Sequence, residues 1–135
     1  MIAVDTNVLL RYIVQDDPVQ SALAERFLEH DLSPQVPGFV SLVAVCEIAW
    51  ALERTYDLPR EAIADAIMGL TKTPQLEIEA GDLVRVAAAQ TRFTIADTII
   101  HLVGQARNCT GTVTFDRKFA RMDGVDLLAG RERGN

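Results

Sequence analysis

The sequence lacks the features that mark membrane, secreted or disulfide-bonded proteins. None of its apolar runs approaches the ~18 residues that a transmembrane helix needs. No basic segment opens the N-terminus, and Asp5 interrupts the first apolar residues too early for a signal peptide. We therefore expect a cytoplasmic protein. The only two cysteines, Cys46 and Cys109, lie in or beside apolar helical patterns. We expect buried thiols there rather than a disulfide or a metal pair.

The chain also lacks an excess of positive charge. It has 13 basic and 19 acidic residues, which gives a net charge of −6. A protein that coats nucleic acid without specificity would be basic, so this class is disfavoured. The negative charge is compatible with a nuclease, because the acids of a metal site would supply part of it and a bound cation would neutralise them. Eleven of the basic residues are Arg, whose forked guanidinium suits phosphate contacts.

No repeat, low-complexity stretch or linker divides the 135 residues, so we predict a single domain over residues 1–130 and a frayed tail over 131–135. Strand-like and helical patterns alternate along it. The expected strands are 1–5, which we expect to be buried, 38–41, 76–79, 111–115 and 125–128, and the expected helices are 7–14, 17–30, 42–56, 59–70, 81–93 and 94–103. This alternation predicts an α/β fold: a parallel sheet of about five strands between two layers of helices.

Four acids lie where this fold would gather them. Asp5 and Asp116 each follow a strand-like run, so both fall at carboxyl ends of strands, on the edge where open α/β sheets bind ligands. Asp97 lies in the first turn of its helix, and Glu47 lies beside the apolar stripe of helix 42–56. Clustered acids repel each other, and divalent cations relieve that repulsion. We therefore predict a site for Mg²⁺ or Mn²⁺.

Each acid, taken alone, also has a purely structural explanation. Asp5 could cap the helix that it precedes. Thr94 and Asp97 have the spacing of a capping box. Glu47 could be a solvated helix residue, and Asp116 could be an ordinary turn acid. Only the four together, in this order and with these flanking residues, favour a common site.

Four segments of the chain resemble the PIN-domain ribonucleases, specifically the VapC toxins of bacterial toxin–antitoxin pairs. The resemblance rests on residues 4–12 (VDTNVLLRY), 47–50 (EIAW), 94–100 (TIADTII) and 114–119 (TFDRKF). It spans the whole chain, and the chain length suits the family. It implies a PIN-like three-layer α/β/α fold and an endoribonuclease.

The resemblance also implies roles for individual residues. Asp5, Glu47, Asp97 and Asp116 would hold Mg²⁺ or Mn²⁺, with Asp116 at the more variable position of the family. Three neighbouring residues would support these acids by hydrogen bonding: Thr6, Asn7 and Thr114. The reaction would be hydrolysis of RNA phosphodiester bonds, in which the number of cations, one or two, stays open.

Three basic residues are candidates for binding the phosphates of the substrate: Arg11, Arg117 and Lys118. A surface charge on a helix explains Arg11 equally well. His101 lies four residues after Asp97 and so on the same helix face. The family pattern does not require a histidine there, so we interpret His101 as a bystander.

The resemblance implies partners as well: a VapB-type antitoxin whose extended tail covers the acidic cleft, and a homodimer or a toxin–antitoxin hetero-oligomer. Two alternatives keep the PIN fold, namely an RNA-processing nuclease that is no toxin and a non-catalytic binding module. A haloacid-dehalogenase phosphatase would need a second Asp where Asn7 stands, so we set that class aside. The target RNA does not follow from the sequence.

Overall fold

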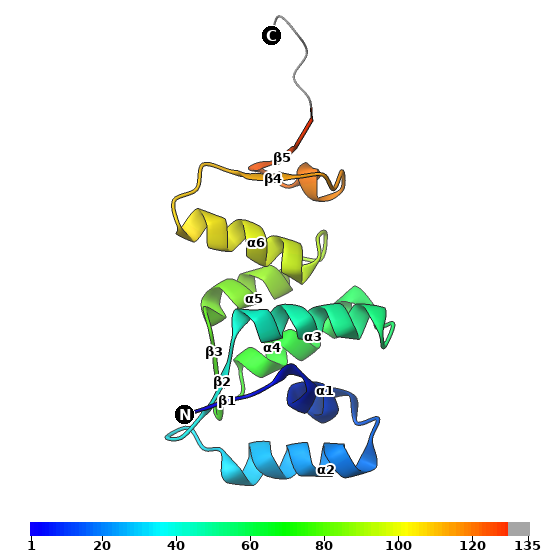
Figure 1. Cartoon of the computed structure of the whole chain (residues 1–135), viewed down its shortest axis with the longest axis vertical. Coiled ribbons are helices and arrows are strands. Elements are labelled where there is room, and N and C mark those ends of the chain that lie inside the picture. The colour runs from blue at the N-terminus through cyan, green and yellow to red at the C-terminus, as the bar shows by residue number, and fades with distance from the viewer. Residues whose placement is uncertain (130–135) are drawn as a thin grey trace, which may run out of the picture.

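A computed structural model describes residues 1–129, so the tail predicted over 131–135 lies outside the described residues (Figure 1). Helices and short strands alternate as the sequence predicts. The elements are β1 (Ile2–Ala3), α1 (Thr6–Val14), α2 (Pro18–Arg26) with the π-helical turn η1 (Phe27–Asp31), β2 (Gly38–Val40), α3 (Leu42–Arg54), α4 (Arg60–Thr71), β3 (Leu76–Ile78), α5 (Gly81–Ala89), α6 (Ile95–Ala106), β4 (Thr112–Thr114), the 3-10 turn η2 (Phe119–Arg121) and β5 (Val125–Leu127). No helix of the described residues is long and apolar enough to cross a membrane.

Short polar side chains fix where four of the helices begin. Asp5, Asp17, Ser41 and Thr94 each accept a hydrogen bond from a backbone N–H in the first turn of α1, α2, α3 and α6, respectively. These N–H groups have no partner within the helix, so a side-chain oxygen stabilises the helix start. The predicted cap at Asp17 is confirmed.

The helix predicted over 81–93 is wrong over residues 90–93, because α5 ends at Ala89. Gln90 has an extended backbone, and the Arg60 guanidinium donates hydrogen bonds to the carbonyl oxygens of Ala87, Gln90 and Phe93. The last carbonyl groups of a helix have no hydrogen-bond donor within the helix. Here the Arg60 side chain from α4 supplies that donor. The sequence pattern near Gln90 gives no sign of this distant partner.

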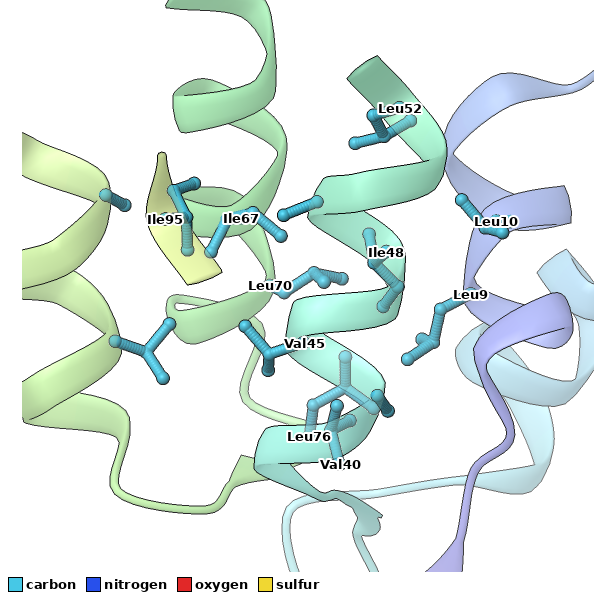
Figure 2. Packing of buried hydrophobic residues seen from close by; sticks show 14 of the residues in the cluster. Leu9, Leu10, Val40, Val45, Ile48, Leu52, Ile67, Leu70, Leu76 and Ile95 are labelled. Carbon is cyan, nitrogen blue, oxygen red and sulfur yellow. The ribbon is translucent and has the colours of Figure 1, made fainter. Parts of the chain in front are cut away.

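Helix α3 forms the centre of the hydrophobic core. Its residues Ile48 and Leu52 are fully buried, and they lie between Leu9 of α1 and Ile67 of α4 (Figure 2). A fully buried side chain of this size contributes about 1.5–3 kcal/mol relative to an exposed one. Because α3 also packs against α6, its position links the N-terminal and C-terminal halves of the chain.

The strands pair in parallel, but they form two sheets instead of one. The first sheet has the order β1-β2-β3, and the second consists of β4 and β5. The chain therefore has the predicted α/β character and five described strands, while the single sheet predicted from the sequence is divided. Figure 1 shows the second sheet at the far end of the molecule from β1, with α3, α5 and α6 between them.

A hydrogen bond joins α6 to β4. Nδ1 of His101 lies 2.8 Å from the Thr112 hydroxyl, and α6 packs on α5 and α3. The second sheet is thus held beside α6, away from the first one. Gly124 in the turn before β5 has φ +85° and approaches the His101 ring so closely that an added Cβ would lie 3.0 Å from Cε1. Only glycine fits such a backbone at low cost.

Two expectations about burial are wrong. Strand β1 is exposed, because its outer edge has no neighbouring strand in the described part of the chain. Cys109 is also exposed, since it lies in the loop after α6 rather than on its packed face, whereas Cys46 is half-buried. Both thiols are free, and burial raises the pKa of Cys46.

Candidate functional site

The first group of predicted site residues lies where β1 meets α1. Asp5 ends the segment after β1, and its Oδ1 accepts a hydrogen bond from the backbone N–H of Thr6 at 2.7 Å. The Thr6 hydroxyl donates to Oε1 of Glu47 on α3, also at 2.7 Å. Thr6 therefore contacts both acids. All three side chains are at least partly exposed.

A cavity of about 520 Å³ adjoins Asp5 and is lined by Asn7 and Arg11 among others. Asn7 is exposed beside Asp5. The Arg11 guanidinium contacts Gln20 at 2.7 Å, Tyr56 at 3.1 Å and Asp16 at 3.4 Å. Since Nε and Nη1 bind these partners, Arg11 connects α1 with α2 and with the turn that follows α3. This geometry favours the structural explanation of Arg11.

The second group, Asp97 and Asp116, lines a separate cavity of about 530 Å³. Lys118 lines this cavity too, whereas the exposed Arg117 does not. Burial raises the pKa of the Asp97 carboxyl, and the negative charges of Asp116 and Glu53 act in the same direction, against a lowering effect of the Thr94 hydrogen bond. The environment of Asp97 therefore disfavours the charged form of its carboxyl group.

Asp116 stabilises the turn in which it lies. Its Oδ1 accepts hydrogen bonds from the backbone N–H groups of Lys118 at 2.8 Å and Phe119 at 3.0 Å. Its own N–H donates to the Thr114 hydroxyl at 3.0 Å. Thr114 thus supports the segment that carries Asp116, and the turn directs Lys118 toward the same cavity.

The local structural roles of these acids leave carboxylate oxygens for other ligands. In Asp5 and Asp116, Oδ1 accepts the local hydrogen bonds, and Oδ2 receives none within residues 1–129. The capping explanation and the metal-site hypothesis are therefore compatible. In the predicted capping box, the backbone N–H of Asp97 donates to the Thr94 hydroxyl at 3.1 Å. This hydrogen bond does not involve the Asp97 carboxylate.

The structure does not bring the four acids together in one chain. Within residues 1–129, no three His, Cys, Asp or Glu side chains lie close enough to hold a metal ion. The carboxylate donors fit Mg²⁺ or Mn²⁺ by their chemistry, because these cations prefer oxygen ligands. Their spacing in a single chain does not fit one ion.

His101 is buried, at 4% exposure, and it bonds to Thr112. This contact holds β4 beside α6. The histidine therefore has a structural role in the fold.

Several residues of the second cavity were not predicted from the sequence. Trp50, Glu53 and Arg54 come from the end of α3, Arg60 from α4, and Arg92 from the loop before α6. Trp50 is 59% exposed although it is the only tryptophan of the chain. An exposed tryptophan off the apolar stripe of its helix is the one signal that could have identified this surface.

Comparisons with known proteins give one match. A family model described as PIN domain matches residues 2–125, which is nearly the whole chain and includes both groups of acids. Comparisons with curated proteins and with solved structures return no match.

Proposed function

The chain belongs to the PIN domain family, and from this premise we propose that it is an endoribonuclease dependent on Mg²⁺ or Mn²⁺. Family membership indicates a nuclease, a hydrolase that acts on nucleic acid. RNA as the substrate and the metal dependence are our proposal. The match over residues 2–125, in a chain that retains all four acids, is the observation that supports it most directly.

The proposed metal ligands are Asp5, Glu47, Asp97 and Asp116. A divalent cation supplies a water of lowered pKa and neutralises negative charge in phosphodiester hydrolysis. The raised pKa of Asp97 supports the assignment, because a nearby cation would favour the charged form that burial disfavours. The supporting residues are Thr6, which orients both acids of the first group, Thr114, which holds the Asp116 turn, and Asn7.

The second cavity has features that suit a single-stranded nucleic acid. Trp50 offers an exposed ring on which a base can stack. The cavity also contains Lys118 and the arginines at positions 54 and 92, which counter the charge of its acids and attract phosphate. Single strands, with unstacked bases and an accessible backbone, match this combination better than a duplex does. We propose Lys118 and Arg117 as phosphate contacts, and Arg11 as the weaker third candidate.

We further propose that the enzyme is the toxin of a VapBC-type pair, with a VapB-type antitoxin as its partner. The four sequence segments that resemble VapC support this proposal. An RNA-processing nuclease of the same family is the alternative, and a non-catalytic PIN-like module is the second. A short open reading frame that abuts this gene, and growth arrest relieved by its product, would favour the toxin.

The test of the nuclease proposal is cleavage of a pool of single-stranded RNAs of different sequence in the presence of Mg²⁺. We expect cleavage by the unmodified chain, none with a chelator, and none by Asp5→Asn at unchanged thermal stability. Asp65→Asn, on the exposed face of α4, is the matched control and should cleave normally. Cleavage by Asp5→Asn at the unmodified rate would refute the metal-site assignment.

A further inference from the structure

The connection between α5 and α6, residues 90–94, is held by side chains rather than by its own backbone. Among the turn and loop hydrogen bonds between backbone groups of residues 1–129, the connection takes part only in the one from the Thr98 N–H to the Thr94 carbonyl. Gln90 has an extended backbone. Backbone N–H and C=O groups away from water need partners, so a short ordered loop of this kind depends on donors and acceptors from elsewhere.

Two side chains, Arg60 and Gln90, supply these partners. Nε of Arg60 donates to the Phe93 carbonyl at 3.3 Å. Nη2 of the same guanidinium donates to the carbonyls of Ala87 and Gln90. The Gln90 amide accepts from the Phe93 N–H at 2.9 Å, and its Nε2 donates to the carbonyls of Ala87 and Phe93, each at 2.9 Å. Both side chains therefore bind the loop at its two ends, Ala87 and Phe93.

The Gln90 amide also reaches into α6. Its Nε2 donates to the Thr98 hydroxyl at 3.0 Å, and this hydroxyl donates to the Thr94 carbonyl at 2.8 Å. Thr98 is buried, and the Thr94 hydroxyl accepts from the backbone N–H of Asp97. A continuous set of hydrogen bonds thus runs from Arg60 on α4 to the first turn of α6. Such a network, when its members are paired, fixes one local arrangement.

The environment of Arg60 shows that its charge is not offered to a ligand. Burial lowers the pKa of its guanidinium, against the raising effect of the negative charges of Glu53 and Glu61. The remaining nitrogen, Nη1, is buried as well and has no hydrogen-bond partner among residues 1–129. A buried charge is costly unless it is hydrogen-bonded. The three carbonyl contacts offset this cost, so the role of Arg60 lies in the loop that it holds.

The loop that these side chains hold faces the second cavity. Arg92, Phe93, Thr94 and Asp97 all line it. Cζ of Arg92 lies 5.2 Å from the centre of the Phe93 ring, which is within the range of a cation–π contact. The backbone of Phe93 is held on both sides, at its N–H and at its carbonyl. The course of the loop therefore sets where Arg92 and Asp97 lie at this cavity.

We propose that Arg60 and Gln90 are positioning residues, which fix the loop 90–93 and through it the placement of Asp97 at the second cavity. A ligand that is held in place beforehand needs little ordering when a cation binds. Loss of either side chain should therefore weaken metal binding although every acid is still present. This consequence for the metal rests on the proposed function, whereas the hold on the loop does not.

Hydrogen exchange tests the hold on the loop. Gln90→Met and Arg60→Lys remove hydrogen bonds to the loop, and each should raise the exchange rates of the Phe93 and Asp97 amides about tenfold or more relative to the amides of α3. Arg60→Lys keeps the charge and one donor nitrogen, so Arg60→Met, which keeps neither, should have the larger effect. The matched control is Ile67→Val, a buried change on α4 that lowers stability through packing and removes no hydrogen bond. Loop exchange equal to that of the control in Gln90→Met and Arg60→Lys would overturn the proposal.

Titration with Mn²⁺ tests the placement of Asp97. Gln90→Met and Arg60→Lys should raise the Kd for Mn²⁺ about tenfold or more, and Ile67→Val should leave it unchanged. Because the acids remain, saturating metal should restore most of kcat, whereas Asp97→Asn stays inactive. An unchanged Kd in both variants, in a chain that needs Asp97 for Mn²⁺ binding, would overturn the positioning role. An unmodified chain that binds no Mn²⁺ would contradict the proposed function, and the exchange rates would still decide whether Arg60 and Gln90 hold the loop.

Discussion

The Thr6 hydroxyl donates a hydrogen bond to Oε1 of Glu47 at 2.7 Å, across a separation of 41 positions in the chain. The backbone N–H of the same residue donates to Oδ1 of Asp5. One threonine thereby fixes two carboxylates from different elements, one at the start of α1 and one on α3. Each carboxylate is left with an oxygen that points to no partner in residues 1–129.

We predict that Thr6→Val lowers activity strongly and stability little. The variant keeps the shape of the side chain and removes the hydroxyl that orients Glu47. The contact is exposed, so its loss should cost at most about 1 kcal/mol in the free energy of unfolding. Thr6→Ser retains the hydroxyl and should keep most of the activity. Equal activities of the Val and Ser variants would show that the hydroxyl has no part in the site.

Replacement of Asp97 by Asn should stabilise the protein in the absence of metal while it abolishes cleavage. Burial and the neighbouring acids raise the pKa of Asp97, so the folded state holds this proton more tightly than the unfolded chain. The resulting destabilisation is present above the folded-state pKa and is relieved as the pH falls toward the unfolded value. Because Asp97 is partly solvated, we expect a rise in Tm of no more than about 3 °C at pH 7.

Thermal unfolding at pH 7 and at pH 4 measures this effect, which should shrink at the lower pH. The control, Asp65→Asn, changes an exposed acid on α4 and should change neither Tm nor activity. A lower Tm for Asp97→Asn at pH 7 would mean that the charged form of Asp97 stabilises the fold.

The Trp50 ring should contribute to substrate affinity. Trp50→Ala removes the exposed ring from the second cavity and should raise the Kd for single-stranded RNA by about 5- to 150-fold, the range of one lost stacking contact. The variant Trp50→Phe keeps an aromatic face and should lose less. Fluorescence anisotropy with a labelled oligonucleotide, in a chelator to prevent cleavage, gives both values. An unchanged Kd for Trp50→Ala would show that the Trp50 ring in this cavity does not bind the RNA.

The position of the β4–β5 sheet depends on Gly124. Gly124→Ala places a methyl group 3.0 Å from the His101 ring on a backbone with positive φ. We therefore expect the free energy of unfolding to fall by more than about 1 kcal/mol. Hydrogen exchange should show faster exchange in β4 and β5. Gly69→Ala is the matched control, because nothing lies within 4 Å of its added methyl group and helix propensity should raise stability. Equal exchange in both variants would contradict the role of the His101 contact.

Local signals in the sequence predicted most of the elements. The cap at Asp17 and the apolar stripe of α3 depend on residues close in the chain, and both lie where they were expected. The end of α5 at Ala89 was missed because its cause is Arg60, a residue from another helix. The family match over residues 2–125 agrees with the family that four short segments indicated.

The spatial relation of the acids could not be predicted in the same way. Asp5 and Asp116 both lie just beyond strands, as the sequence indicates, but the periodicity of a strand does not say which sheet it joins. In the structure β4 contacts α6 through His101 and Thr112, two residues whose sequence context shows no pairing. The cavity around Trp50 likewise arises from packing between α3, α4 and the loop before α6.

Titration with Mn²⁺, followed by electron paramagnetic resonance, tests most directly whether the separated acids serve one metal site. We predict that Asp5→Asn and Asp97→Asn, from the two different groups, each weaken the same binding event by at least about tenfold, and that the control Asp65→Asn leaves it unchanged. Binding to both Asn variants with the affinity of the unmodified chain would contradict the account.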